Sequence, residues 1–107
     1  MTTKIINIAA DFSEYPAGRY LSDGPYSGEK FRKDFLVPAL RGNEQIVVEI
    51  DGVEGYGSSF LEECFGGLIR EEGFSREELQ KKLRIKFEDH DFEIYQQEIM
   101  DYIMQAE

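Results

Sequence analysis

The chain has 107 residues, a length that favours one domain with a single hydrophobic core and requires neither a disulfide nor a metal for stability. Its 22 acidic and 12 basic residues give a formal net charge of −10, which disfavours binding to nucleic acids and to anionic membranes. The single cysteine, the absence of a secretory signal and the lack of a long apolar run predict a cytoplasmic protein without an internal disulfide.

The first 43 residues combine two strand patterns with one helical pattern. Residues 4–9 predict a first strand, and residues 18–21 predict a second, short one. A helix is predicted to begin after Ser27, its N-cap, with Phe and Leu at helical spacing on the inner side and residues 32–34 on the outer side. Pro38 lies inside this pattern and is expected to kink the helix or to interrupt its hydrogen bonding.

The stretch from Ile46 to Arg70 organises the rest of the chain. Residues 45–51 are a nearly continuous β-branched run, which predicts a strand covered on both faces, as parallel strands are. A glycine-rich loop follows, and an apolar stripe then predicts an amphipathic helix. Ser59 and Glu62 stand three residues apart and predict a capping box at the start of this helix.

The Gly66–Gly67 pair inside this helix leaves two interpretations open, which are close packing against a neighbouring element and a flat surface on which a partner docks. The remaining sequence predicts three elements: a short helix at about 76–82 after a Ser75–Glu78 capping box, a half-exposed edge strand at 83–87, and a final helix from about residue 94. Together the patterns predict a single α/β domain over residues 1–107, with a small mixed β-sheet of about four strands flanked by about four helices.

The serine pair is the main candidate site. Ser58 and Ser59 stand where the N–H groups at a helix start converge, which suits an anion or a phosphate carried on a serine. A cap explains Ser59, whereas Ser58 has less structural explanation and is the better candidate for phosphorylation. The surface predicted to contact a partner consists of Gly55, Tyr56, Gly57, Phe60, Glu62 and Glu63.

Other chemistry has weaker support. A serine nucleophile needs a base, but the only histidine, His90, is distant in sequence, and Phe60 stands where a Gly-x-Ser-x-Gly motif needs its second glycine. The acidic segment 88–91 matches no metal-binding loop, and Asp51 with Glu54 is a weak acid–base pair. We therefore expect no enzyme activity, no metal and no cofactor, and Cys64 is most simply a buried apolar residue.

The strand–loop–helix stretch resembles a STAS domain, the fold of bacterial anti-sigma factor antagonists. Their pattern is close to Asp-x-Ser-x-Val-x-x-x-Asp-Ser-Ser-Gly-Leu, and the matching run here is Gly52–Leu61. More closely, residues from about Ile5 to Tyr102 resemble a STAS-like family of unknown function. The resemblance rests on Ser-Gly-Glu-x-Phe-Arg at 27–32, on an apolar strand ending in Asp-Gly-Val, and on Ser-Ser-Phe-Leu-x-Glu followed by Phe-Gly at 58–66.

This resemblance implies a mixed sheet flanked by helices and a regulatory protein-binding module without enzyme activity. In the antagonists, a histidine-kinase-like ATPase phosphorylates the serine that corresponds to Ser58. Gly57 stands where they have an aspartate, and Phe60 where they have a glycine. The implied partner is such an ATPase or an anti-sigma-like factor in bacterial signalling. The alternative is a small-ligand or nucleotide sensor that uses the Gly55–Ser59 turn.

Overall fold

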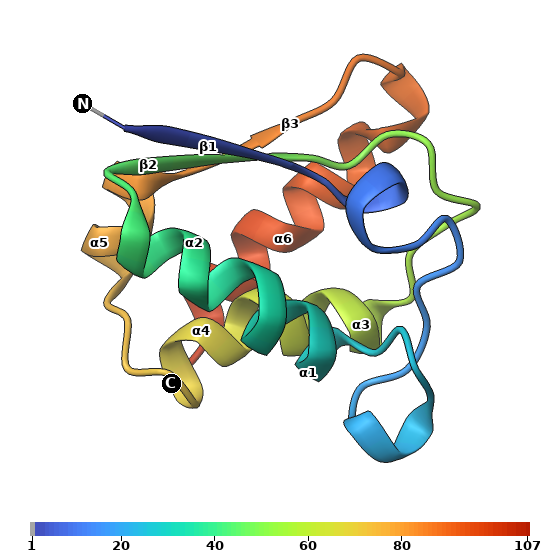
Figure 1. Cartoon of the computed structure of the whole chain (residues 1–107), viewed down its shortest axis with the longest axis horizontal. Coiled ribbons are helices and arrows are strands. Elements are labelled where there is room, and N and C mark those ends of the chain that lie inside the picture. Colours follow the sequence, from blue (N-terminus) through green and yellow to red (C-terminus); the bar gives the residue numbers. More distant parts are fainter. Residues whose placement is uncertain (1) are drawn as a thin grey trace.

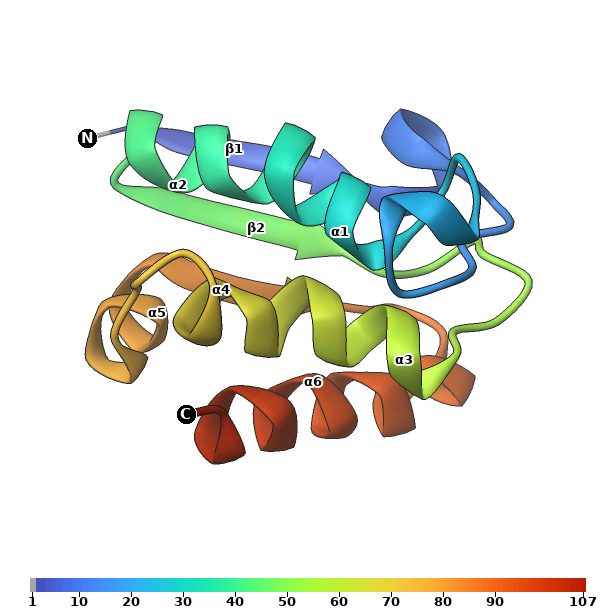
Figure 2. The ribbon, with the colours of Figure 1, turned by 90° about the horizontal axis from the view of Figure 1, so that it is seen from below.

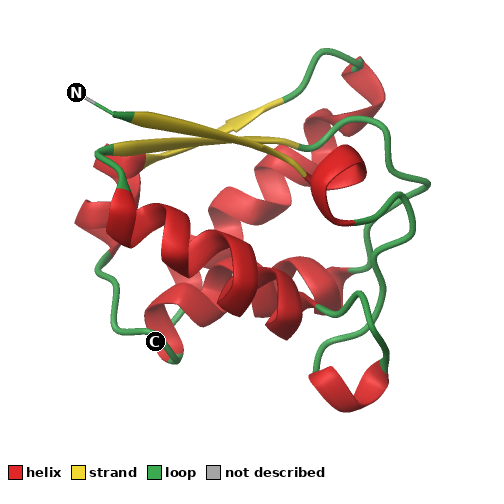
Figure 3. Cartoon of the chain, viewed as in Figure 1, coloured by secondary structure: helices red, strands yellow, loops and turns green. Residues whose placement is uncertain are grey.

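The computed structural model describes residues 2–107, which form one sheet with helices on one of its faces (Figures 1 and 3). The strands are β1 (Thr3–Asn7), β2 (Gln45–Glu49) and β3 (Leu83–Lys86). They are parallel and lie in the order β1-β2-β3, so β2 is central. The α/β class is thus confirmed, with three parallel strands in the described chain instead of a mixed sheet of about four.

Burial alternates along β2 and β3, whereas the first three residues of β1 are all exposed. In β2, Ile46 and Val48 are fully buried toward the helices, whereas the residues between and beside them are only partly buried. Val47 lies in register with Ile5 and Arg84, which are exposed. The prediction that this strand is covered on both faces is therefore wrong. Its β-branched run reflects strand propensity on the outer face and does not require burial there.

Two long helices begin in the segments that carry the family resemblance, and Figure 2 shows them lying along the sheet. The first joins α1 (Gly28–Phe31), η3 (Arg32–Leu36) and α2 (Val37–Gly42). The second joins α3 (Ser58–Leu61), η4 (Glu62–Gly66) and α4 (Gly67–Arg70). Both η3 and η4 are π-helical, so each helix widens in its middle.

Pro38 lies in the first turn of α2, directly after the π-helical segment η3. Proline lacks an N–H group, and its ring crowds the carbonyl four residues earlier. A wider π turn relieves that crowding. The expected interruption is therefore present, and the helix nevertheless continues to Gly42.

The remaining helices are α5 (Arg76–Lys82) and α6 (Glu93–Gln105), with short turns at η1 (Ile8–Phe12), η2 (Leu21–Asp23) and η5 (His90–Phe92). The Ser75–Glu78 capping box is present, with Ser75 Oγ accepting from Glu78 N at 3.0 Å. The strand predicted at 18–21 is wrong. The Asp23 carboxylate accepts from the N–H groups of Arg19 and Tyr20 at 3.0 and 2.8 Å, so a local turn replaces strand pairing there.

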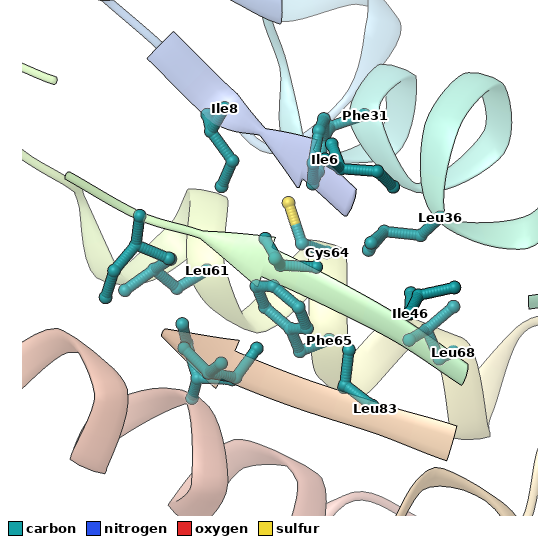
Figure 4. Close-up of a cluster of buried hydrophobic side chains, with 14 of the residues drawn as sticks. Ile6, Ile8, Phe31, Leu36, Ile46, Leu61, Cys64, Phe65, Leu68 and Leu83 are labelled. Carbon is teal, nitrogen blue, oxygen red and sulfur yellow. The ribbon is translucent and has the colours of Figure 1, made fainter. Parts of the chain in front are cut away.

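The core fills the space between the inner face of the sheet and the helices (Figure 4). Cys64 is fully buried in it, as expected, and burial raises the pKa of its thiol. The residues labelled in Figure 4 come from all three strands, from η1 and from both long helices: Ile6, Ile8, Phe31, Leu36, Ile46, Leu61, Cys64, Phe65, Leu68 and Leu83.

Candidate functional site

The serine pair occupies the position expected from the sequence. Ser58 and Ser59 are exposed, and they open the helix that follows the loop leaving the central strand. The N-cap, however, is Gly57, and no side chain caps this helix end. The predicted Ser59–Glu62 capping box is therefore wrong. The helix begins two residues earlier than that box requires, and Glu62 pairs with arginines instead.

Ser58 interacts with the phenol of Tyr102 on α6. Burial raises the pKa of Tyr102 and the charge of Glu98 adds to it, whereas a hydrogen bond with Ser58 lowers it. Glu62, one turn after Ser58, also raises this pKa. Ser58 is thus an exposed residue that interacts with Tyr102, and Glu62 follows it four residues later in the same helix.

Three of the residues predicted to contact a partner are buried. Tyr56 is 8% exposed and donates its hydroxyl to Ile50 O at 2.7 Å, while Phe60 is 1% and Glu63 is 3% exposed. Burial also raises the pKa of Tyr56. A partner cannot reach these side chains in the folded protein, so we exclude them from the candidate contact surface. Gly55, Gly57 and Glu62 stay in it with the two serines.

Glu63 has an internal partner in Arg32, which the sequence pattern placed on the outer side of its helix. Arg32 is 2% exposed, and its Nη1 donates to Glu63 Oε2 at 2.6 Å and to Glu63 O at 2.7 Å. Its Nε donates to Glu72 Oε2 at 2.9 Å. Burial alone would lower the pKa of Arg32, but the two carboxylates outweigh burial and raise it, so the guanidinium stays charged.

Two more arginines complete this ion network. Arg19 Nη1 contacts Glu62 Oε1 at 2.5 Å and Glu63 Oε1 at 3.0 Å, and Arg70 Nη1 contacts Glu62 Oε2 at 2.7 Å. The network borders a hollow of about 640 Å³. None of the residues that line this hollow belongs to the Gly55–Ser59 turn: Arg19, Tyr20, Glu29, Arg32, Lys33, Glu63, Arg70, Glu71 and Glu72.

Glycines allow the helices to come this close. A Cβ on Gly28 would lie 2.6 Å from Phe60 O. Gly66 and Gly67 are buried, and a Cβ on Gly67 would collide with the Arg32 guanidinium. Of the two interpretations of the Gly66–Gly67 pair, close internal packing is therefore correct.

The motifs that carry the family resemblance thus form a joint between the two long helices. Ser27 caps the first helix by accepting from Lys30 N at 3.2 Å, Gly28 permits the close approach, and Arg32 pairs with Glu63. The Arg32–Glu63 pair of these motifs thus has a structural explanation. Glu62 and Glu63 are the two charges of the 58–66 segment, whereas Arg32 stands among other charged residues and carried no sequence signal of its own.

The acidic residues near the end of β2 and β3 have local roles. Asp51 accepts from Glu88 N and Asp89 N at 3.0 Å, and Asp89 accepts from Asp91 N at 3.0 Å. These bonds stabilise the turn that leads to η5. Within residues 2–107, no group of three or more side chains is arranged to hold a metal ion.

A central strand leads through a glycine-containing loop to a serine pair at a helix start, as the resemblance to STAS domains predicts. The chain belongs to the family described as STAS-like domain of unknown function (DUF4325), whose profile matches residues 27–91. The matched range contains all three segments that carry the resemblance and is shorter than the expected range of about 5–102. No curated protein and no solved structure is significantly similar to the chain. None of the helices in residues 2–107 has the length and apolarity needed to cross a membrane.

The ion network predicts a specific response to acid. Burial raises the pKa of Glu62, but its bonds with Arg70 and Arg19 outweigh burial and lower the pKa below the ordinary 4.5. A pKa that is lower in the folded state stabilises the fold above pH 4.5, and this contribution is lost as the pH falls through the folded-state pKa. We expect Glu62→Gln to destabilise the protein at pH 7 and to flatten its loss of stability below pH 4.5.

Urea unfolding at pH 7 and at pH 3 measures this effect. The same substitution at Glu77, an exposed residue of α5, is the matched control and should leave the pH dependence of the wild type unchanged. If Glu62→Gln and wild type lost the same free energy of unfolding between pH 7 and pH 3, these ion pairs would not contribute to the acid sensitivity.

Proposed function

We propose that this protein is a non-enzymatic regulatory module that binds a protein partner through the start of α3, and that phosphorylation of Ser58 controls the binding. The observation that carries the proposal is the exposed serine pair at the end of the loop from the central strand, in a chain of a STAS-like family. The contact surface consists of Gly55, Gly57, Ser58, Ser59 and Glu62.

A phosphate on Ser58 would change the charge of this surface strongly. It would add nearly two negative charges next to the phenol of Tyr102 and about one helical turn from Glu62, against a gain of only about 0.3–1 kcal/mol from the helix dipole. A partner that accepts the unmodified hydroxyl would then meet a concentrated negative charge. Phosphorylation therefore releases that partner.

The partner class comes from the STAS resemblance, which implies a histidine-kinase-like ATPase or an anti-sigma-like factor. The test incubates the protein with ATP and with the histidine-kinase-like ATPase encoded nearest to it, followed by intact-mass and peptide mass spectrometry. We expect one phosphate on Ser58. Ser58→Ala should abolish the mass gain, and the matched Ser59→Ala variant should retain it. No mass gain, together with no complex on size-exclusion chromatography, would refute the proposal.

A further inference from the structure

The loop that leaves the carboxyl end of β1 exposes several large apolar side chains (Figures 1 and 2). Tyr15, Tyr20, Leu21 and Tyr26 are between 45% and 66% exposed, and they are four of the eight large apolar side chains that residues 2–107 expose. Tyrosine is enriched among the residues that dominate binding at protein interfaces. The loop therefore has the composition of a contact surface.

Bonds within the protein hold this loop in place. Ala17 N donates to Tyr26 O at 3.0 Å, which brings the two arms of the loop together. Arg19 then ties the loop to the second long helix through its contacts with Glu62 and Glu63 on η4. A surface that is already ordered loses little conformational entropy when a partner binds. The exposed tyrosines are thus presented by a preorganised loop.

This loop and the loop after β2 carry an excess of negative charge. Glu54 N donates to Glu14 O at 2.9 Å, so the two loops lie side by side. Together, residues 8–26 and 50–57 contain five carboxylates and one cation, Arg19, which pairs with the glutamates of η4. None of the five forms an ion pair within residues 2–107: Asp11, Glu14, Asp23, Asp51 and Glu54.

The cations that border these loops are already matched by carboxylates. Lys86, at the end of β3, lines a hollow together with four carboxylates, one of which is Asp51. On the other side, Tyr20 borders the hollow of about 640 Å³, where Lys33 pairs with Glu29 at 3.0 Å and the arginines belong to the ion network. Neither hollow gives the surface a positive charge, so its net charge is negative and complements a basic partner.

We propose that the loop of residues 13–26 binds a basic segment of a protein partner, whose arginine side chains stack on the exposed tyrosines and face Glu14 and Asp23. A guanidinium stacks on an aromatic ring and also bonds to carboxylates, so arginine matches both parts of this surface. A second copy of this chain is not complementary, because it presents the same negative charge. The proposal concerns a second surface and does not rest on the function proposed for Ser58.

Three synthetic Gly-Ser peptides, with arginine, lysine or glutamate at the same spaced positions, test this proposal. Each is titrated into the ¹⁵N-labelled full chain, and amide shifts are followed by NMR. We expect the arginine peptide to shift amides of residues 13–26, the lysine peptide to bind about threefold more weakly, and the glutamate peptide to bind at least about tenfold more weakly. Equal binding of the arginine peptide and either other peptide, binding of none, or shifts confined to the rest of the chain would overturn the proposal.

Two sets of variants separate the loop from the net charge of the chain. Tyr15→Ala combined with Tyr20→Ala should weaken binding of the arginine peptide about tenfold, whereas Ile94→Ala, at a residue of α6 that is 61% exposed, should leave it unchanged. Glu14→Lys should weaken binding about fivefold or more, whereas Glu77→Lys, the same charge change on α5, should alter it less than about twofold. Equal effects of the two lysine variants would overturn the proposal, because net charge alone would then explain the binding. A dimer in sedimentation that the double tyrosine variant dissociates would also overturn it, because a second copy would then cover the loop.

Discussion

Replacing Arg32 with Met is expected to lower the free energy of unfolding by about 3 kcal/mol, the low end of the range for breaking a buried ion pair. The change removes the Nη1 bonds to Glu63 and the Nε bond to Glu72 while both carboxylates remain. Glu63 is 3% exposed and cannot regain water without a movement of the helices. Arg19 and Arg70 still contact its Oε1, which keeps the loss from being larger.

Urea unfolding at pH 7 measures this loss. The double variant Arg32→Met with Glu63→Leu should recover most of the lost stability, because a well-packed apolar pair can replace a buried ion pair at little cost. Lys30→Met is the matched control. Lys30 pairs with Asp34 at 2.6 Å, but both side chains are about half exposed, so the change should cost less than about 0.5 kcal/mol. A loss below 1 kcal/mol for Arg32→Met would contradict a structural role for the pair.

Replacing Gly28 with Ala is expected to cost about 2 kcal/mol, a typical value for forcing an extra methyl group into a packed interior. The new Cβ would lie 2.6 Å from Phe60 O, 3.0 Å from Glu63 Cβ and 3.3 Å from Cys64 N. Two of these atoms are backbone, so the long helices must separate. That movement also lengthens the bonds between Arg32 and Glu63, and we expect the change to be less than additive with Arg32→Met.

Gly42→Ala is the matched control for Gly28→Ala. Gly42 ends α2, has no atom within 4 Å of a built Cβ, and is exposed. Alanine there should be neutral or should stabilise the helix by up to about 1 kcal/mol. If both variants had the same stability in urea unfolding, close packing at Gly28 would not be important for the joint.

Local patterns in the sequence predicted most of the elements. The capping box at Ser75, the alternation in β3 and the loop between β2 and the serine pair depend on neighbouring residues, and the structure contains all of them. The strand predicted at 18–21 failed because the Asp23 carboxylate supplies a competing turn. Nothing in the sequence of residues 18–21 indicated that their N–H groups would bond to the Asp23 carboxylate.

Features that depend on distant residues were less predictable. The periodicity of the first helix places Arg32 outside, yet its side chain is buried because Glu63 and Glu72, more than thirty residues away, accept its hydrogen bonds. The ion pair with Arg32 also explains why Glu63 is buried and is no longer part of the candidate contact surface. The β-branched run of β2 identified a strand but could not reveal that helices cover only its inner face. In contrast, the exposure of Ser58 followed from the helix start and the preceding glycines.

The most direct test of the proposed function is a calorimetric titration of the nearest-encoded histidine-kinase-like ATPase, with ADP bound, into wild type and Ser58→Asp. We predict that Ser58→Asp weakens the complex by at least about tenfold, because it places negative charge on a contact surface that already carries Glu62. The same substitution at Ser22, an exposed serine of η2, should leave the affinity unchanged. Equal affinities for wild type and Ser58→Asp would contradict the assignment of this helix start as the regulated contact.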